Sequence, residues 1–293
     1  MRKIILSALA LSLLAFSACK KDKDPTDNPD TGPKLRFKFV LDSTLARLDN
    51  LGNPEPIESG HAAQTPQFNL IGAHYIELAP TMYTALGTGT VLYVGEETTA
   101  GGSKALNFEK EKLVGDNQEF FSMPIKDVTP GSYEWLRVSL AYQNFNIKYR
   151  YNGVVYTGTL ASFIGYNTYI KDYKIKNKTV SVNANKLQGY WGFEESTTGF
   201  TLTGQVPSGA ITVPNPLFAT APIPSGSCVV TGSFPTAFTV TGNETEDVTV
   251  VVRVSINKSF EWIDNGNDGY YDTSGSPDVV TDMGVRGIYP IIE

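Results

Sequence analysis

The amino-acid sequence predicts an all-β protein, an antiparallel β-sandwich built as one elaborate domain, with two packed β-domains as the alternative. Three observations predict this class. Apolar and polar residues alternate with a period of two along most of the chain, as in half-buried strands. Turn signals recur at intervals of roughly 8–12 residues. No segment has the convincing periodicity of an amphipathic helix.

Candidate strands recur along the whole body. Asn152-Gly153, between two tyrosine-rich runs, is the signal of a type I′ turn in a hairpin. A second turn is expected at Lys176–Lys178. Residues 247–256 (DVTVVVRVSI) are the most continuously apolar, so we expect them in the middle of a sheet, buried on both faces. In chain order the candidate strands occupy residues 35–41, 68–78, 90–97, 134–166, 168–183, 187–195, 199–206, 228–234, 247–257, 260–264 and 282–292.

The predicted body spans residues 34–293, about 260 residues, enough for one large β-domain or two small ones. Residues 204–227 are proline-rich and cannot form a central strand, because proline donates no ladder hydrogen bond. If there are two domains, the boundary is expected either in that stretch or near residues 180–187.

The N-terminus has the features of a bacterial lipoprotein signal peptide, residues 1–18. Arg2 and Lys3 precede an apolar run that is too short for a membrane span, which needs about 20 residues. The run ends in Ser17-Ala18-Cys19, which resembles the lipobox of bacterial lipoproteins. That resemblance implies that Cys19 is acylated and becomes the mature N-terminus, and an ordinary cleaved secretory signal is the alternative.

Residues 19–33 are expected to form a disordered tether, because from Lys20 to Pro33 they carry no large apolar side chain that could be buried. Lys20 directly after the cysteine resembles lipoproteins that are sent on to the outer membrane. Several acyl chains on one residue would anchor the chain stably. The chain has two cysteines, so lipidation of Cys19 leaves Cys228 without a partner, and we expect it to be a buried, unreactive strand residue.

The charge of the chain argues against two classes of partner. The formal net charge is −6, and it becomes −8 when the signal peptide is removed with Arg2 and Lys3. Nucleic acids and anionic lipid surfaces both need basic patches. We therefore expect no nucleic-acid partner.

The loop after residue 262 carries the only pattern typical of a calcium site. Calcium takes six to eight oxygen ligands, and loops supply them from alternate positions. With Asp264 at position 1, Asp268 stands at 5, the carbonyl of Tyr270 at 7 and Asp272 at 9. Glycines stand where a third acidic ligand and the bidentate glutamate would be expected. The alternative is a polar turn with solvated aspartates.

A second metal hypothesis comes from a family resemblance. The stretches GAHYIELAP, VLYVGEE and VTPGSYEWLRVSLAY, within residues 35–142, resemble β-sandwich lipoproteins related to methanobactin-associated copper-binding proteins. Thr129–Tyr133 would correspond to a turn of that family. The resemblance implies a β-sandwich and copper handling. With only His61 and His74 in the chain, no copper ligand set carries over; we interpret His74 as a hydrogen-bonded strand residue and His61 as a loop residue.

Catalytic patterns are sparse. Glu96/Glu97 and Glu194/Glu195 are adjacent pairs, and neighbouring residues of a strand point to opposite faces. Each pair could therefore supply only one member of a glycosidase dyad. One group of aromatic residues either fills the core or forms a stacking platform for sugars or another flat ligand: Tyr166, Tyr169, Tyr173, Tyr190 and Trp191.

These features predict a lipid-anchored lipoprotein of the Gram-negative outer membrane, facing the cell surface or the periplasm, that acts as a non-enzymatic binding or structural module. Its expected partners are the membrane, through the lipid anchor, and an unidentified protein or glycan. Two alternatives stay open. Trp191 or the Tyr166–Tyr173 group, exposed beside paired carboxylates in a cleft, would favour an envelope hydrolase acting on glycans. His61 and His74 within reach of one ion would favour copper handling.

Overall fold

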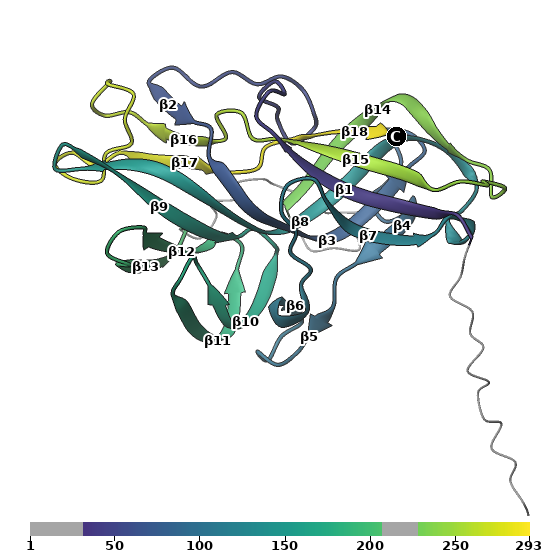
Figure 1. The fold of residues 1–293 in the computed structure, drawn as a ribbon, viewed down its shortest axis with the longest axis horizontal. Coiled ribbons are helices and arrows are strands. Elements are labelled where there is room, and N and C mark those ends of the chain that lie inside the picture. The colour runs from purple at the N-terminus through teal and green to yellow at the C-terminus, as the bar shows by residue number, and fades with distance from the viewer. Residues whose placement is uncertain (1–31, 207–227) are drawn as a thin grey trace, which may run out of the picture. The chain divides into compact units, whose positions relative to one another are not determined.

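A seven-stranded antiparallel sheet, the central sheet, organises the fold (Figure 1). The computed structural model describes residues 32–206 and 228–293. The order of the strands is β13-β12-β9-β8-β3-β4, and β14 also pairs with β8. Their bounds are β3 Gln67–Ala79, β4 Thr90–Val94, β8 Gly131–Tyr151, β9 Val154–Phe163, β12 Tyr190–Glu195, β13 Thr201–Gln205 and β14 Cys228–Val240.

Three smaller sheets complete the described part of the chain. The β1 sheet has the order β18-β15-β1-β7, the β10 sheet β11-β10-β6-β5 and the β16 sheet β17-β16-β2. The bounds are β1 Lys34–Asp42, β2 His61–Gln64, β5 Glu97–Thr98, β6 Ala105–Asn107, β7 Gln118–Pro124, β10 Asn167–Lys174, β11 Thr179–Leu187, β15 Val248–Ser255, β16 Phe260–Ile263, β17 Val279–Met283 and β18 Ile288–Ile292.

The all-β prediction is confirmed. Two 3₁₀ turns, η1 Phe108–Lys110 and η2 Ile125–Asp127, are the only helical elements in the described ranges. None of the helices there has the length and apolar character needed to span a membrane. Among the named strands of the described residues the pairing is antiparallel except at β1–β15 and β6–β10, which are parallel. A parallel neighbour needs a long connection, and β1 and β15 come from opposite ends of the body.

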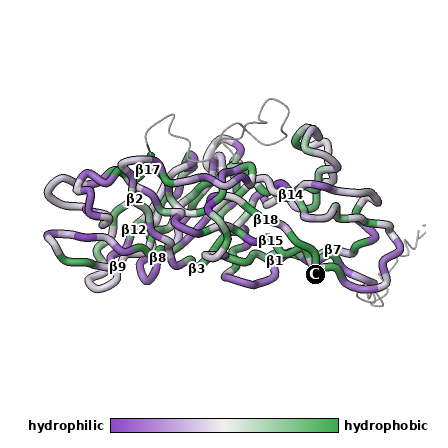
Figure 2. The backbone as a smooth tube through the Cα atoms, turned by 90° about the horizontal axis from the view of Figure 1, so that it is seen from above, coloured by the Kyte–Doolittle hydropathy of each residue, from purple (hydrophilic) through white to green (hydrophobic). Residues whose placement is uncertain are grey.

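The smaller sheets cover the central sheet, and each contact has its own apolar core. The largest core joins the β1 sheet to β3, β8 and β14. A second core lies between the β10 sheet and β8, β9 and β12, and a third between the β16 sheet and the far end of β8 and β9. Figure 2 shows hydrophobic residues along β1 and β15, whereas many of the connecting turns are hydrophilic. Apolar burial of this kind is the main favourable term in folding.

Strand β12 shows how one strand serves two layers. A Cβ on Gly192 would come within 2.2 Å of the Tyr173 hydroxyl oxygen in the β10 sheet. Its neighbours Trp191 and Phe193 instead pack on the core of the β16 sheet. Because successive strand residues face opposite ways, the β10 and β16 sheets lie on opposite faces of the central sheet here.

Several local predictions are confirmed. Asn152 and Gly153 both have positive φ, 49° and 77°, and join β8 to β9 as a two-residue turn. Residues 248–255 form β15, a central strand between β1 and β18 with most of its side chains buried. Cys228 begins β14 as a buried free thiol.

Residues 32–293 form one compact unit, as judged from the contacts between their Cα atoms. One predicted boundary, near 180–187, falls inside strand β11. The other, at 204–227, lies mostly outside the described residues, as do the signal peptide, Cys19 and nearly all of the tether. Since the unit has its own cores, we expect it to fold without residues 1–31.

Candidate functional site

A cavity of about 760 Å³ lies between the β16 sheet and the β8–β9–β12–β13 end of the central sheet. We call this cavity the aromatic groove. Cavities of roughly 300–1,000 Å³ lined by apolar and aromatic side chains are typical of small-molecule sites. The ring side chains that line it are Tyr149, Tyr151, Tyr156, Trp191, Phe193, Phe200, Phe260 and Tyr271.

Two rings of the groove wall lie directly on glycines of neighbouring strands. A Cβ on Gly204 would come within 2.4 Å of Cζ2 of Trp191, and a Cβ on Gly158 within 2.0 Å of Cε2 of Phe193. Any other residue at these glycines would displace the rings. The missing side chains let the indole and the phenyl ring rest on the sheet backbone, as aromatic residues cover glycines in other β-sheets.

The remaining rings extend this surface. Tyr149 stacks on Tyr156 with ring centroids 5.7 Å apart. Its ring also meets that of Phe193 edge to face, with centroids 5.4 Å apart. On the opposite wall Tyr271 packs against Phe260 at 5.2 Å. Such pairs are typical of ordered aromatic clusters. The groove is thus lined by rings that hold one another in place.

The one carboxylate in the groove lining, Glu195, is already bound within the protein. It accepts a 2.7 Å hydrogen bond from the Thr198 hydroxyl and two from the backbone N–H groups of Thr198 and Thr197, at 2.5 and 2.7 Å. These donors lower the pKa of Glu195 to about 2. The carboxylate therefore fixes the turn after β12.

Glu194, the other member of this pair, points to the opposite face. Although burial acts to raise its pKa, the backbone N–H groups of Lys176, Asn177 and Lys178 hold that pKa below its usual range. Their distances to Oε2 are 2.9, 2.9 and 3.0 Å. The prediction that the pair diverges is confirmed. The groove that Trp191 lines thus contains a single carboxylate of this pair, and that carboxylate is engaged.

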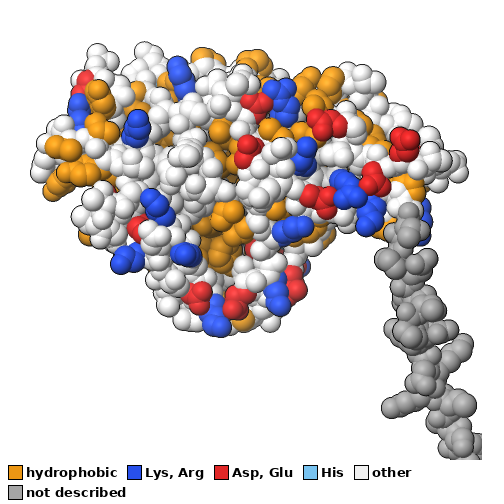
Figure 3. Space-filling view, in the orientation of Figure 1, with side chains coloured by type: hydrophobic (Ala, Val, Ile, Leu, Met, Phe, Trp, Pro, Cys, Tyr) orange, Lys and Arg blue, Asp and Glu red, His pale blue; other side chains and the backbone are white. Residues whose placement is uncertain are grey.

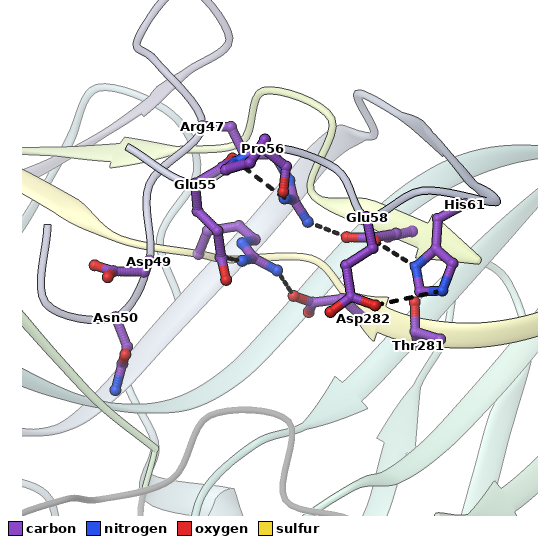
Figure 4. Close-up of a pocket in the computed structure, with 11 residues that line it drawn as sticks. Arg47, Asp49, Asn50, Glu55, Pro56, Glu58, His61, Thr281 and Asp282 are labelled. Carbon is purple, nitrogen blue, oxygen red and sulfur yellow. Dashed lines mark hydrogen bonds and ion pairs between the residues drawn. The ribbon is translucent and has the colours of Figure 1, made fainter. Parts of the chain in front are cut away.

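A second cavity, the polar cleft, has a volume of about 460 Å³ and contains His61 (Figure 4). His61 opens β2, and its Nδ1 lies 2.6 Å from Oε1 of Glu261 on β16. The buried guanidinium of Arg47 pairs with the other oxygen of Glu261. His61 was expected in a loop and is a strand residue instead, because β2 pairs with β16 across residues that are far apart in the sequence.

The other half of the polar cleft is also an ion network. Arg286 pairs with Asp282 and Glu55. Burial raises the pKa of Asp282 to about 7, against the opposing charge of Arg47. Arg47 also donates to the backbone oxygens of Pro56, Glu55 and Lys258. Most of the charged side chains in the polar cleft are therefore paired with other groups of the protein.

The two histidines lie in separate surroundings. His74 lies in β3, with Nε2 3.4 Å from Oε1 of Glu97 and its ring 5.4 Å from that of Tyr166. His74 is a strand residue as expected, and the Glu97 carboxylate is its polar partner. Burial lowers the pKa of His74 to about 4, although the contact with Glu97 acts to raise that pKa. Across residues 32–206 and 228–293, no group of three or more His, Cys, Asp or Glu residues is placed to hold a metal ion.

The aspartates of the candidate calcium loop have protein partners. Arg150 pairs with both Asp268 and Asp272 and lies over the ring of Tyr270, 4.6 Å from its centroid. Asp264 accepts hydrogen bonds from the backbone N–H groups of Asp268 and Gly269, at 3.3 and 2.8 Å. These contacts are those of a polar turn that is bound to the end of β8 through Arg150. Calcium binding at this loop stays a prediction.

The predicted aromatic platform is divided by the fold. Tyr166, Tyr173 and Tyr190 are buried, so for these three the core interpretation is confirmed. Tyr169, on β10, is half-buried. Only Trp191 reaches the groove. The other groove rings were missed, although the alternate spacing of Tyr149 and Tyr151 in β8, and of Trp191 and Phe193 in β12, marks one face of each strand.

Comparisons with known proteins add no assignment. No family model, no curated protein and no solved structure matches this chain.

Proposed function

We propose that the protein is a lipid-anchored, non-enzymatic binding module of the cell envelope and that the aromatic groove is its ligand site. The observation that carries this proposal is the groove itself, a large cavity lined by rings that rest on glycines and on one another. Its carboxylate accepts three hydrogen bonds from the turn after β12, which supports a structural role for Glu195. Rings held in place reduce the ordering cost of binding.

The N-terminal sequence supports the anchor. The short apolar run ending in Ser17-Ala18-Cys19, followed by the polar residues 20–33, is typical of an acylated lipoprotein with a tethered body. Figure 3 shows acidic and basic side chains intermingled on the face drawn, without a single broad basic field. This distribution and the net charge of −6 favour an uncharged or protein ligand over nucleic acid.

The polar cleft favours a second candidate function, an envelope hydrolase acting on glycans. A histidine oriented by a carboxylate is one part of a general-base arrangement. His61 and Glu261 form such a pair at the cleft. Hydrolysis of an envelope polysaccharide by the wild type, lost in His61→Ala, would favour this candidate over a binding module.

The body, residues 32–293, is the material for the binding test. Separated polysaccharide, lipid and peptidoglycan fractions of a Gram-negative envelope are titrated while the tryptophan fluorescence is recorded. We expect one fraction to bind the wild type and to bind Trp191→Ala at least about tenfold more weakly. Tyr83→Ala is the matched control, because Tyr83 is exposed and is not among the residues that line the groove. Equal binding of all three proteins, or of none, overturns the groove as the ligand site.

A further inference from the structure

We infer that the ligand of the aromatic groove is a neutral carbohydrate, an assignment that rests on the proposed function. The first reason is the geometry of the rings. Trp191 lies on Gly204 and Phe193 on Gly158, so each ring has one face on the sheet. Both residues line the cavity. A flat, immobile ring surface matches the C–H face of a pyranose, which is itself flat and rigid.

The charges around the groove give the second reason. Glu195 is the only ionisable acid or base among the lining residues apart from tyrosines, and three hydrogen bonds from its own turn occupy it. Arg150, at the end of β8 beside the groove, is bound by Asp268 and Asp272. An anionic ligand would therefore be desolvated beside Glu195 without a positive partner, which costs free energy. The groove selects against anionic ligands such as uronic acids and phosphates.

Hydroxyl groups give the third reason. The lining includes four tyrosines and also Thr198, Gln205, Thr273 and Thr281. Hydroxyl and amide groups keep acceptor positions when they donate within the protein. Thr198 donates to Glu195, and Thr273 to the carbonyl of Arg150. A sugar offers many hydroxyl groups to such positions, whereas an acyl chain would leave them unsatisfied.

Exposure at the rim suggests how the ligand extends. Tyr151 and Phe200 both line the groove, and their side chains are 50% and 57% exposed. Exposed rings at the border of a cavity can stack on sugar units that project from it. An oligosaccharide longer than the cavity would therefore gain contacts that a monosaccharide lacks.

The experiment titrates the body with cellohexaose, maltohexaose and mannohexaose, and follows tryptophan fluorescence and calorimetric heat. A galacturonic acid hexamer is the charged probe and hexadecanol the apolar probe. We expect at least one neutral hexasaccharide to bind, and the corresponding monosaccharide to bind at least about tenfold more weakly. Tyr151→Ala and Phe200→Ala should weaken binding several-fold. Both alter exposed side chains, so the fold is expected to survive even if Trp191→Ala is unstable. Tyr83→Ala should bind like the wild type.

Three outcomes overturn the inference. If hexadecanol binds in a Trp191-dependent way and no neutral hexasaccharide does, the groove is an apolar-chain site; the proposed function then stands and the carbohydrate assignment fails. Binding of the galacturonic acid hexamer at least as tight as that of the neutral hexasaccharides excludes selection for neutral sugars. Absence of binding by all probes also rejects the carbohydrate assignment, while the fractionated envelope separately decides whether the groove binds anything.

Discussion

The side chains of Glu111 and His74 both lie against Gly95; His74 is buried and Glu111 is half-buried. The position that a Cβ of Gly95 would take is 3.5 Å from Oε2 of Glu111 and 3.5 Å from Cδ2 of His74. Both oxygens of the Glu111 carboxyl group are buried and lack a hydrogen-bond partner. Burial raises the pKa of Glu111 to about 8. A buried carboxyl group without a hydrogen-bond partner has a lower free energy when protonated than when ionised.

This arrangement predicts a pH-dependent stability. The unfolded chain releases the Glu111 proton near pH 4.5, whereas the folded chain keeps it until about pH 8. Between these values the folded state binds more protons, so the free energy of unfolding falls as pH rises, by up to about 1.4 kcal/mol per pH unit. Glu111→Gln should remove this component.

Denaturant unfolding of the wild type and Glu111→Gln at pH 7, 8 and 9 checks the prediction. In this range His74, whose pKa burial lowers to about 4, stays neutral in the folded protein and adds little to the slope. The variant should gain stability relative to the wild type as pH rises from 7 to 8. Parallel pH profiles for the two proteins would show that Glu111 is ionised throughout.

The calcium loop makes a second prediction, because Arg150 occupies the carboxylates that calcium would need. If the loop binds calcium, Arg150→Gln should bind it more tightly than the wild type, and Asp268→Ala should not bind it. Calcium at five times its dissociation constant would stabilise the fold by about 1 kcal/mol and raise its melting temperature by about 2–4 °C. A melting curve of Arg150→Gln that millimolar calcium leaves unchanged would identify the loop as a polar turn only.

The third prediction concerns the anchor. Replacing Cys19 with serine removes the proposed acylation site and should release the full-length protein from the membrane fraction, because the acyl chains are the proposed attachment. Fractionation of cells and metabolic labelling with a palmitate analogue measure this. Cys228→Ser is the control and should stay membrane-bound. Retention of Cys19→Ser at the membrane to the same extent would exclude a lipid anchor at this residue.

The fourth prediction concerns Cys228, whose side chain is buried and whose thiol pKa is raised by burial. The thiolate is the reactive form, so alkylation of the native body at pH 8 should be at least about a hundredfold slower than in denaturant. Mass spectrometry over time follows the modification. Equal rates in the two conditions would place Cys228 at an accessible site.

The sequence by itself determined the elements of this fold that depend on neighbours along the chain. Alternation in residues 35–41 predicted β1, the continuously apolar run in residues 247–256 predicted β15, and Asn152-Gly153 predicted the turn of the β8–β9 hairpin. It also determined that Glu194 and Glu195 diverge, since the two-residue period of a strand needs no tertiary information. The same reasoning placed Cys228 in a buried strand.

The candidate site was decided only by the tertiary structure. Its walls come from residues 147–160, 191–206 and 260–283, and strand periodicity does not specify which sheet will cover a given face. Trp191 belongs to the aromatic group noted from the sequence and lines the groove, but its contact with Gly204 depends on the pairing of β12 with β13. Arg150 reaches Asp272 across 122 residues of sequence. The physical reason is that strand pairing and sheet packing join distant segments through their shapes and charges, which no local pattern contains.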